Sequence, residues 1–263
     1  MKMKKSFCLL AMVIFLASGC VNNYEKFFQG HSDIPPSVLL PHQGEPEVFS
    51  GSNYEADGLA LMAQGYLQLG YSSFNATSSS ETNLIEQAKK IGAAKVLTYQ
   101  QYTNTEQGAM PLTLPKNQTT YHSGSVSAYG SGSSSYGSYS GTSTTYGSTT
   151  TYIPYSNRRY DFHASYWAKA KPSILGVHLR DLTPDERQAI GRNTGTTVIT
   201  PIYGSPAFNA DILTGDIILS INGEKVSDGQ RLKSLLGSRR GSEVSILIHR
   251  RGREIVKNVK LNP

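Results

Sequence analysis

Apolar side chains recur at helix and strand spacings in the first half of the chain. Leu59, Met62 and Tyr66 follow one another at the i, i+3 and i+7 positions after Asn53, a residue that favours the helix N-cap. This spacing predicts a helix. Residues 67–71 then alternate apolar and polar side chains, and this alternation predicts a strand.

A second helix and two further strands are predicted after this pair. Ser78 and Glu81 have the spacing of a capping box ahead of an apolar stripe that closes at Gly92. Residues 95–102 are a strand candidate, and residues 159–169 alternate as a half-buried strand does. We expect the two strands to pair and one helix to cover one face of the resulting sheet, which makes a small αβ-layer domain.

The segment between the paired strands differs in composition from the rest. We expect residues 105–157 to be an insertion within a small α+β domain of residues 51–171. Residues 119–152 contain 11 Ser, 8 Thr, 6 Gly and 6 Tyr and no charged residue. Too few aliphatic groups are present to offset the entropy lost on folding, so a flexible loop or a loosely paired hairpin arm is expected. The interleaved tyrosines leave open a surface that pairs with another chain or with glycan.

The last third of the chain carries dense local signals. Residues 183–186 combine an N-cap, a proline at the first helical position and a glutamate three residues after the cap. Residues 205–207 open a single helical turn, and residues 227–236 form a capped helix with three leucines. Asn222 and Gly223 are typical of a type I′ hairpin turn. Residues 174–177 lead into a short strand, and further strands are predicted at residues 196–202, 217–221, 244–248 and 255–261.

The N-terminus has the pattern of an export signal. Residues 7–17 are apolar, follow three lysines and are too short to span a bilayer, which takes about 20 residues. Residues 17–20, Ala-Ser-Gly-Cys, resemble a bacterial lipobox, although Ala17 stands where leucine is commoner. The resemblance implies removal of residues 1–19 and lipid modification of Cys20. The alternative is a conventionally cleaved, secreted protein with one spare thiol.

Signal removal also changes the charge and the available chemistry. The whole chain has a net charge of +6, and three of its lysines lie in the signal, so the basic character is weak evidence for nucleic-acid binding. Cys8 leaves with the signal and Cys20 is acylated, which leaves no thiol for a disulfide, a zinc site or a nucleophile. Residues 20–50 are rich in proline and glycine and predict a tether. In a Gram-negative cell, Val21 fits sorting to the outer membrane.

The signals of residues 172–263 occur in an order that resembles the PDZ domain of HtrA-type proteases. Asp211 departs from the pattern, because such domains usually have glycine there, and Ser173 stands where an aromatic residue or glycine is often found. The motifs that carry the resemblance are Ile174-Leu175-Gly176-Val177, Leu182-Thr183-Pro184, Gly204-Ser205-Pro206-Ala207, Gly215-Asp216-Ile217-Ile218 and Ile221-Asn222-Gly223.

The resemblance implies a partly open β-barrel capped by two helices, with a groove that binds a peptide as an added strand. Backbone amides of the loop at residues 174–177 would receive the ligand's terminal carboxylate, with Gly176 allowing the loop to curl. Lys233 would attract an acidic ligand, or it is simply a solvated helix residue. The peptide-binding candidates are Ile174, Leu175, Gly176, Val177, Gly229, Gln230 and Lys233.

Signatures of catalysis are missing from the sequence. It contains no Gly-Asp-Ser-Gly-Gly or Gly-x-Ser-x-Gly pattern and no phosphate-binding loop. Asp161 and His163 lie two apart on one predicted strand, with His178 nearby, but no third ligand is spaced to complete a metal site. We therefore expect a protein that is not an enzyme and has no cofactor, no metal and no nucleic-acid partner.

The sequence as a whole predicts a lipid-anchored protein of the bacterial envelope, on the outer membrane facing the periplasm. Its expected partners are protein C-termini or extended peptides, bound without catalysis. Three alternatives stay open: a regulator or adaptor of a periplasmic HtrA-like protease, a structural protein whose groove is filled by its own linker or N-terminal domain, and an enzyme with a site in residues 50–170.

Overall fold

The computed structural model describes residues 21–263 and has the mixed α+β fold that the sequence predicts. The lipidation predicted at Cys20 lies outside the described residues. The chain divides into two compact units, one of residues up to Gln101 together with Asp161–Pro263, the other Tyr102–Tyr160. No helix among the described residues has the length and apolar character needed to cross a bilayer.

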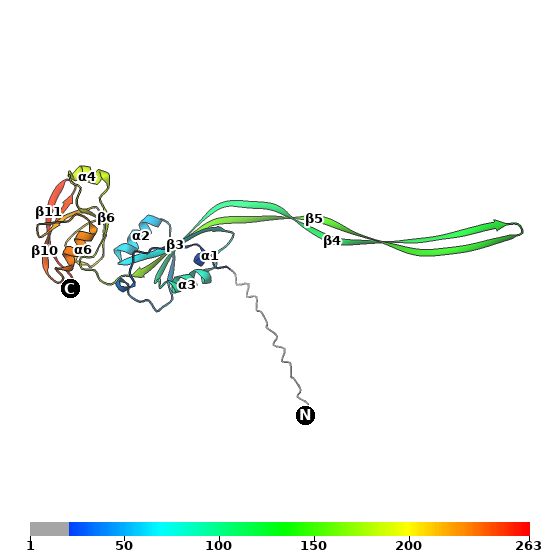
Figure 1. The fold of residues 1–263 in the computed structure, drawn as a ribbon, viewed down its shortest axis with the longest axis horizontal. Coiled ribbons are helices and arrows are strands. Elements are labelled where there is room, and N and C mark those ends of the chain that lie inside the picture. Colours follow the sequence, from blue (N-terminus) through cyan, green and yellow to red (C-terminus); the bar gives the residue numbers. More distant parts are fainter. Residues whose placement is uncertain (1–20) are drawn as a thin grey trace, which may run out of the picture. The chain divides into compact units, whose positions relative to one another are not determined.

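The first sheet interleaves early and late segments of the chain (Figure 1). β1 pairs antiparallel with β3 at one edge, and β2 pairs parallel with β4 at the other. The predicted pairing of the strands that begin at residue 95 and end at residue 169 is confirmed, because β4 and β5 are neighbours. The order across the sheet is β1 (Phe28–Gly30), β3 (Tyr66–Ala76), β5 (Ser133–Lys169), β4 (Lys95–Gly130) and β2 (Glu47–Ser50).

Local capping determines where the helices of this domain begin. They are α1 (Asn23–Lys26), α2 (Tyr54–Ala63) and α3 (Glu81–Lys90), and the short 3-10 turn η1 (Pro36–Val38) lies between β1 and β2. Asn53 caps α2, as predicted, because its side chain accepts hydrogen bonds from two backbone amides of the first turn. The cap of α3 is Ser80 and not Ser78, since the Ser80 hydroxyl accepts from the backbone amide of Asn83.

The end of β5 is buried on both faces of the sheet, and the half-buried strand expected from the sequence is therefore wrong. Leu61 of α2 packs with Trp167 on one face. Tyr166, which points to the opposite face, is also fully buried and its hydroxyl lies 3.1 Å from the hydroxyl of Ser72. A strand covered on both faces loses its polar alternation: residues 164–168 are all buried, and Ser165 is a buried polar residue among them.

Residues 21–50 belong to the folded domain, which corrects the predicted tether. They supply α1 and both edge strands, and Tyr24 is only 5% exposed. The rings of Tyr24 and Phe74 pack edge to face at a centroid distance of 4.9 Å. Strands of three and four residues carry no periodic signal of their own, because they are specified by pairing with β3 and β4.

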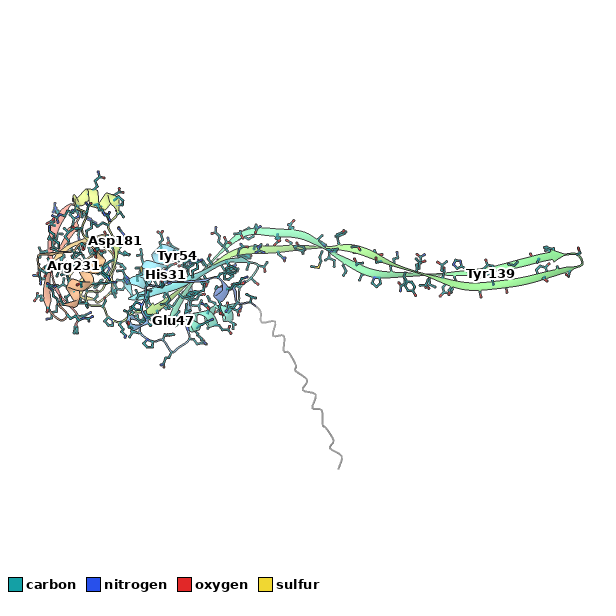
Figure 2. The ribbon with its side chains drawn as sticks, in the orientation of Figure 1. His31, Glu47, Tyr54, Tyr139, Asp181 and Arg231 are labelled. Atoms are coloured by element: carbon teal, nitrogen blue, oxygen red, sulfur yellow. The ribbon has the colours of Figure 1, made fainter. Side chains whose placement is uncertain are left out.

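The unit Tyr102–Tyr160 is a paired two-stranded hairpin, built from the remaining parts of β4 and β5 (green in Figure 1). Hydroxyl pairs cross the strands at Thr113–Thr150, 2.9 Å apart, and at Thr119–Thr144, 3.2 Å apart, so the strands run antiparallel. Figure 2 shows side chains along the whole ribbon, with Tyr139 labelled. The Ser/Tyr-rich insertion thus forms strands, and the hairpin unit is slightly longer than the insertion predicted at residues 105–157.

The last third forms a second sheet with three helices, of which α5 is the single helical turn expected at residues 205–207. α4 keeps the predicted capping box between Thr183 and Glu186, and the type I′ turn has positive φ at Asn222 and Gly223. Asp211 adopts the left-handed conformation, with φ 56°. The sheet order is β11 (Arg253–Lys260), β10 (Glu243–Arg250), β8 (Ile217–Ile221), β7 (Thr196–Pro201) and β6 (Val177–Asp181), with β9 (Glu224–Lys225) paired to β8. The helices are α4 (Pro184–Ile190), α5 (Pro206–Asn209) and α6 (Gly229–Gly237).

Candidate functional site

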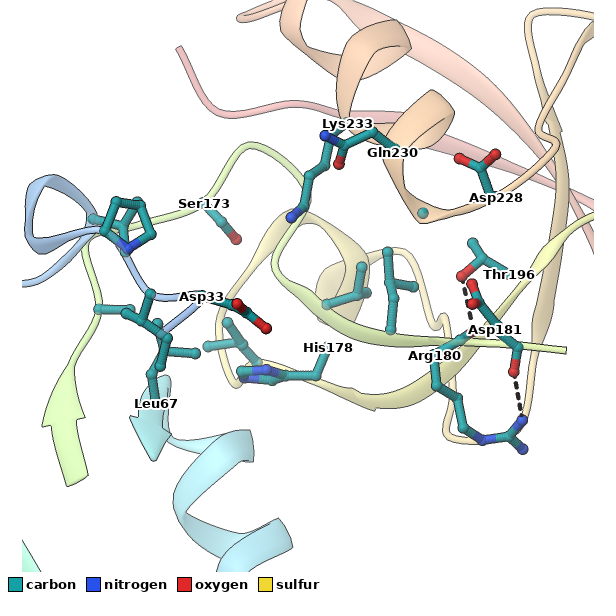
Figure 3. A pocket seen from close by; sticks show the side chains of 18 of the residues that line it. Asp33, Leu67, Ser173, His178, Arg180, Asp181, Thr196, Asp228, Gln230 and Lys233 are labelled. Carbon is teal, nitrogen blue, oxygen red and sulfur yellow. Dashed lines mark hydrogen bonds between the residues drawn. The ribbon is translucent and has the colours of Figure 1, made fainter. Parts of the chain in front are cut away.

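A groove runs between β6 and α6 and opens a cavity of about 760 Å³ (Figure 3). β6 is the end strand of its sheet and pairs only with β7 among the described strands. Its outer backbone edge is therefore free for hydrogen bonding and faces the groove. Val177 and Leu179 line the cavity from the strand, and Gly229, Gln230 and Lys233 line it from the helix.

The core of the domain holds the two walls in place. Val177 and Leu179 pack partly buried against the main core cluster. Asp228 caps α6 by accepting the backbone amide of Arg231 at 2.8 Å. The three leucines of α6 are buried in the core, while Gly229, Gln230 and Lys233 of the same helix line the groove. A glycine there leaves space for a ligand side chain.

The loop before β6 has its carbonyls tied to the body of the domain. Ile174 accepts from the amide of Asn262 at 3.0 Å, Leu175 from Ala207 at 2.9 Å, and Gly176 from Ile202 at 2.9 Å. The C=O and N–H of a trans peptide unit point in opposite directions. The amides that follow these three carbonyls therefore point away from the groups that bind the carbonyls.

Gly176 is required for this loop geometry. Its φ is +79°, and a Cβ at this position would lie 2.1 Å from the Cβ of Ser205. The Ser205 hydroxyl donates to the Gly176 carbonyl at 3.0 Å and accepts the amide of Phe208 at 3.3 Å. The close approach allows one serine to secure both the loop and the first turn of α5.

The structure brings four of the seven candidate residues together in the groove: Val177, Gly229, Gln230 and Lys233. The side chain of Leu175 lies in the core, 2% exposed, and does not line the cavity. Ile174 also packs against the core. For these two residues and Gly176, any contribution to binding would come from the backbone amides.

Two kinds of cavity residue were not predicted from the sequence. Leu179 lies two positions after Val177, so strand alternation was a usable signal for it. The other kind comes from the N-terminal domain, where Leu67 and the segment around η1 form an additional wall. That wall consists of Asp33, Ile34, Pro35 and Val38, and no sequence pattern relates it to a groove 140 residues later.

The end of α2 holds the N-terminal domain against β6 and β7. The last carbonyls of a helix lack partners within the helix. Here the Met62 carbonyl lies 3.0 Å from Nε2 of His178, and the Ala63 carbonyl accepts the amide of Tyr203 at 2.8 Å. Because a carbonyl only accepts, Nε2 of His178 carries the hydrogen. His178 itself lines the groove.

Among the charged residues that line the groove, Arg180 is engaged in an ion pair, and Asp33, Asp181 and Asp228 contribute carboxylates. Arg180 binds Glu186 through two hydrogen bonds of 2.7 Å. The Arg180 guanidinium lowers the pKa of Glu186 to about 2, with smaller contributions from Thr183 and Thr197. Lys233 has no such partner among the described contacts and reaches toward the cavity in Figure 3.

Acidification is expected to destabilise the contact made by His178. Burial lowers the pKa of His178, and the Met62 carbonyl, which raises it, only partly compensates. The unfolded chain has an ordinary histidine pKa of about 6.5. Below that pH the unfolded state binds more protons, so stability is complete above pH ~6.5 and declines as the pH falls toward the lowered pKa of the folded state.

We expect the melting temperature of residues 21–263 to fall as the pH is lowered through this window, and to fall less in His178→Gln, which keeps a donor for Met62. Burial also lowers the pKa of His163, so His163→Gln is the companion variant that removes the second contribution of the same sign. Scanning fluorimetry at a series of pH values measures the slope. An unchanged slope in His178→Gln would contradict the assignment.

Comparison with known proteins identifies the family of the domain that contains the groove. A family model for the PDZ domain matches residues 173–261. A probable periplasmic serine endoprotease DegP-like protein of Rhizobium meliloti (strain 1021) is 31% identical over 90 residues, 33% of this chain and 18% of the relative. Its counterpart in Bartonella henselae is 34% identical over 91 residues, 34% and 18% of the two chains.

Two solved structures are also similar to part of the chain. The HtrA-type protease AlgW with decapeptide has a TM-score of 0.31 and 24% identity, over 37% of this chain and 36% of that one. The HtrA3 PDZ domain bound to a phage-derived ligand has a TM-score of 0.31 and 20% identity, over 34% and 84%.

The similarity to curated proteins is confined to one domain, and the chain spans only 18% of the length of the two curated relatives. The matched residues comprise the loop, β6 and α6, which are the parts that build the groove. Residues 173–261 of this chain are a PDZ domain related to those of HtrA-type proteins.

Proposed function

We propose that the groove between β6 and α6 binds the C-terminal segment of another protein by strand addition. The free outer edge of β6, facing an open cavity beside α6, is the observation that carries this proposal. An extended peptide would pair with that edge, and its alternate side chains would enter the cavity.

The loop supports recognition of a terminal carboxylate. The amides of Leu175, Gly176 and Val177 follow carbonyls that are bound by the body of the domain, so they point away from those contacts. Successive backbone N–H groups can form a site that binds anions. Lys233 adds a positive charge on the opposite wall. The ligand would thus be a chain end and not an internal loop.

In this proposal the protein acts without catalysis, as a scaffold or sensor. It is anchored through Cys20 to the outer membrane and faces the periplasm. The lipobox resemblance of residues 17–20 and the residue Val21 support the anchor. Two relatives of the PDZ domain are named as periplasmic, which supports the compartment. Metabolic labelling with a palmitate analogue, with Cys20→Ser as the control, tests lipidation.

A second candidate function is regulation of an HtrA-like protease. The observation that favours it is the 31% and 34% identity between this PDZ domain and regions of DegP-like relatives. Similar grooves would compete for the same chain ends. Co-purification with a protease from envelope extracts, lost when the groove is disrupted, would favour this role.

The peptide proposal is tested with matched pairs of ligands. We expect residues 21–263 to bind some members of a C-terminal peptide library with micromolar affinity, about 8 kcal/mol in total. Amidation of the same peptides should weaken binding at least tenfold, because an amide brings no charge to the loop. Fluorescence polarisation measures both.

Two results would overturn this function. Equal binding of acid and amide forms would exclude a carboxylate loop. Absence of binding to every peptide would favour the structural alternative, in which the wall formed by residues 33–38 keeps ligands out of the groove.

A further inference from the structure

The hairpin unit, Tyr102–Tyr160, presents two chemically different faces. Side chains alternate between faces along a strand. The pairs Thr113–Thr150 and Thr119–Thr144 place odd positions of β4 opposite even positions of β5. Five tyrosines share that face, and their side chains are 68–81% exposed. This tyrosine face carries Tyr121, Tyr129, Tyr136, Tyr146 and Tyr152.

The opposite face is rich in glycine. Where a tyrosine is available on this face, its ring covers a glycine: a Cβ on Gly124 would lie 2.5 Å from the Tyr139 ring, and one on Gly108 would lie 2.5 Å from the Tyr155 hydroxyl. Other glycines on this face are not covered by a ring. Gly137 and Gly141 have no atom within 4 Å of the corresponding Cβ position. This glycine face therefore shows both ring-on-glycine packing and unfilled places for it.

Within the hairpin unit, no further helix or strand covers these two faces. The unit consists of two strands, and isolated two-stranded hairpins are marginally stable in water. Proteins often protect exposed strand edges with charged residues. Residues 117–157 contain no Asp, Glu, Lys or Arg. Nothing in this segment opposes its pairing with an identical, uncharged ribbon.

The tyrosine face is large enough to form an interface. Each tyrosine buries about 150–250 Å² when covered. Five of them at this exposure supply roughly the 800 Å² that one partner contributes to a stable complex. A second copy of the hairpin also offers uncovered glycines, where there is space for a tyrosine ring. A glycan or a charged protein surface does not offer such positions.

We propose that the hairpin is a self-association module, in which the tyrosine face of one copy packs on the glycine face of a second copy. In this contact, tyrosine rings of one copy cover Gly137 and Gly141 of the other copy, as Tyr139 covers Gly124 within one copy. The contact is heterologous, because the two copies use different surfaces. Each pair keeps one free tyrosine face and one free glycine face, so assembly can continue beyond two copies.

Sedimentation of residues 21–263 over a range of concentrations tests the proposal. We expect wild type to assemble with increasing concentration. Tyr136→Ser with Tyr146→Ser removes rings, and Gly137→Thr with Gly141→Thr fills the space at the uncovered glycines while favouring the strand. Each double variant should assemble at least tenfold more weakly. Tyr203→Ser, which removes a 62% exposed tyrosine from the PDZ domain, is the matched control and should not change assembly.

Mixing the two double variants separates this arrangement from symmetric association. The first keeps an intact glycine face and the second keeps an intact tyrosine face, so the mixture should form pairs that stop at two copies. A wild-type chain that stays monomeric up to ~100 µM would overturn the proposal, since stable interfaces of this size form well below that concentration. A monomer retained on a polysaccharide matrix through the same tyrosines would assign the face to glycan instead.

Discussion

Replacing Gly176 by alanine is expected to abolish peptide binding by the PDZ groove. The added methyl would lie 2.1 Å from the Cβ of Ser205, and the backbone would have to keep φ at +79°. Left-handed backbone costs about 1–2 kcal/mol for a non-glycine residue, and overpacking adds about 1–3 kcal/mol. The loop relieves this by moving, which turns its amides out of position, so affinity should fall by at least ~100-fold.

Gly252→Ala is the matched control for this substitution. Gly252 also has φ +79°, but it lies in the turn between β10 and β11 and has open space at the Cβ position. It should cost about 1–2 kcal/mol of stability and leave peptide affinity unchanged. Fluorescence polarisation and urea unfolding measure the two quantities separately. Binding by Gly176→Ala within twofold of wild type would refute the role of the loop.

The second large effect is expected from Arg250→Ala in the PDZ core. Asp216 is 1% exposed, and both of its carboxylate oxygens accept hydrogen bonds of 2.7 Å from Arg250. Removing the guanidinium would leave a buried carboxylate without its counter-charge. Breaking such a pair costs about 3–5 kcal/mol. We expect a loss of this size in the free energy of unfolding, measured with urea on residues 21–263.

An exposed ion pair provides the control for that measurement. Arg192 and Glu254 also lie 2.7 Å apart, with side chains 47% and 44% exposed. Surface pairs contribute about 0–1 kcal/mol, so Arg192→Ala should change stability little. If the two substitutions cost the same, burial would not be what makes the Asp216 pair important.

The PDZ fold was predictable because its signals are local. The capping box of Thr183 and Glu186 and the turn at Asn222 and Gly223 need only a few neighbouring residues, and the structure contains both. Asp211 takes the left-handed conformation that its position in the pattern requires. Each of these features is decided within four residues of sequence, which is why their order was sufficient to indicate the domain.

The N-terminal domain was less predictable because its structure depends on distant pairings. β1 and β2 are short edge strands that exist through β3 and β4, and a segment that contains them has the composition of a linker. Trp167 and Tyr166 point to opposite faces, yet both are buried, because helices cover both sides of the sheet. The alternation of apolar and polar residues along a strand cannot indicate that the second face of the sheet is also covered.

The residues that line the groove could also be predicted only in part. Val177, Gly229 and Lys233 follow from the order of strand and helix, and they line the cavity. Leu175 does not, because the carbonyls of its loop are anchored inward and its side chain fills the core. The wall around Pro35 depends on how α2 meets His178, a contact between residues 116 positions apart.

The strand order of the first sheet affects how the chain can fold as it is made. β5 lies at the centre of the order β1-β3-β5-β4-β2, but it ends at Lys169 and is the last of the five to be synthesised. The N-terminal domain therefore cannot close until the whole hairpin has been produced, and closing such a long loop is slow. The PDZ sheet uses only strands after Val177, so the segment synthesised last does not have to wait for the one synthesised first.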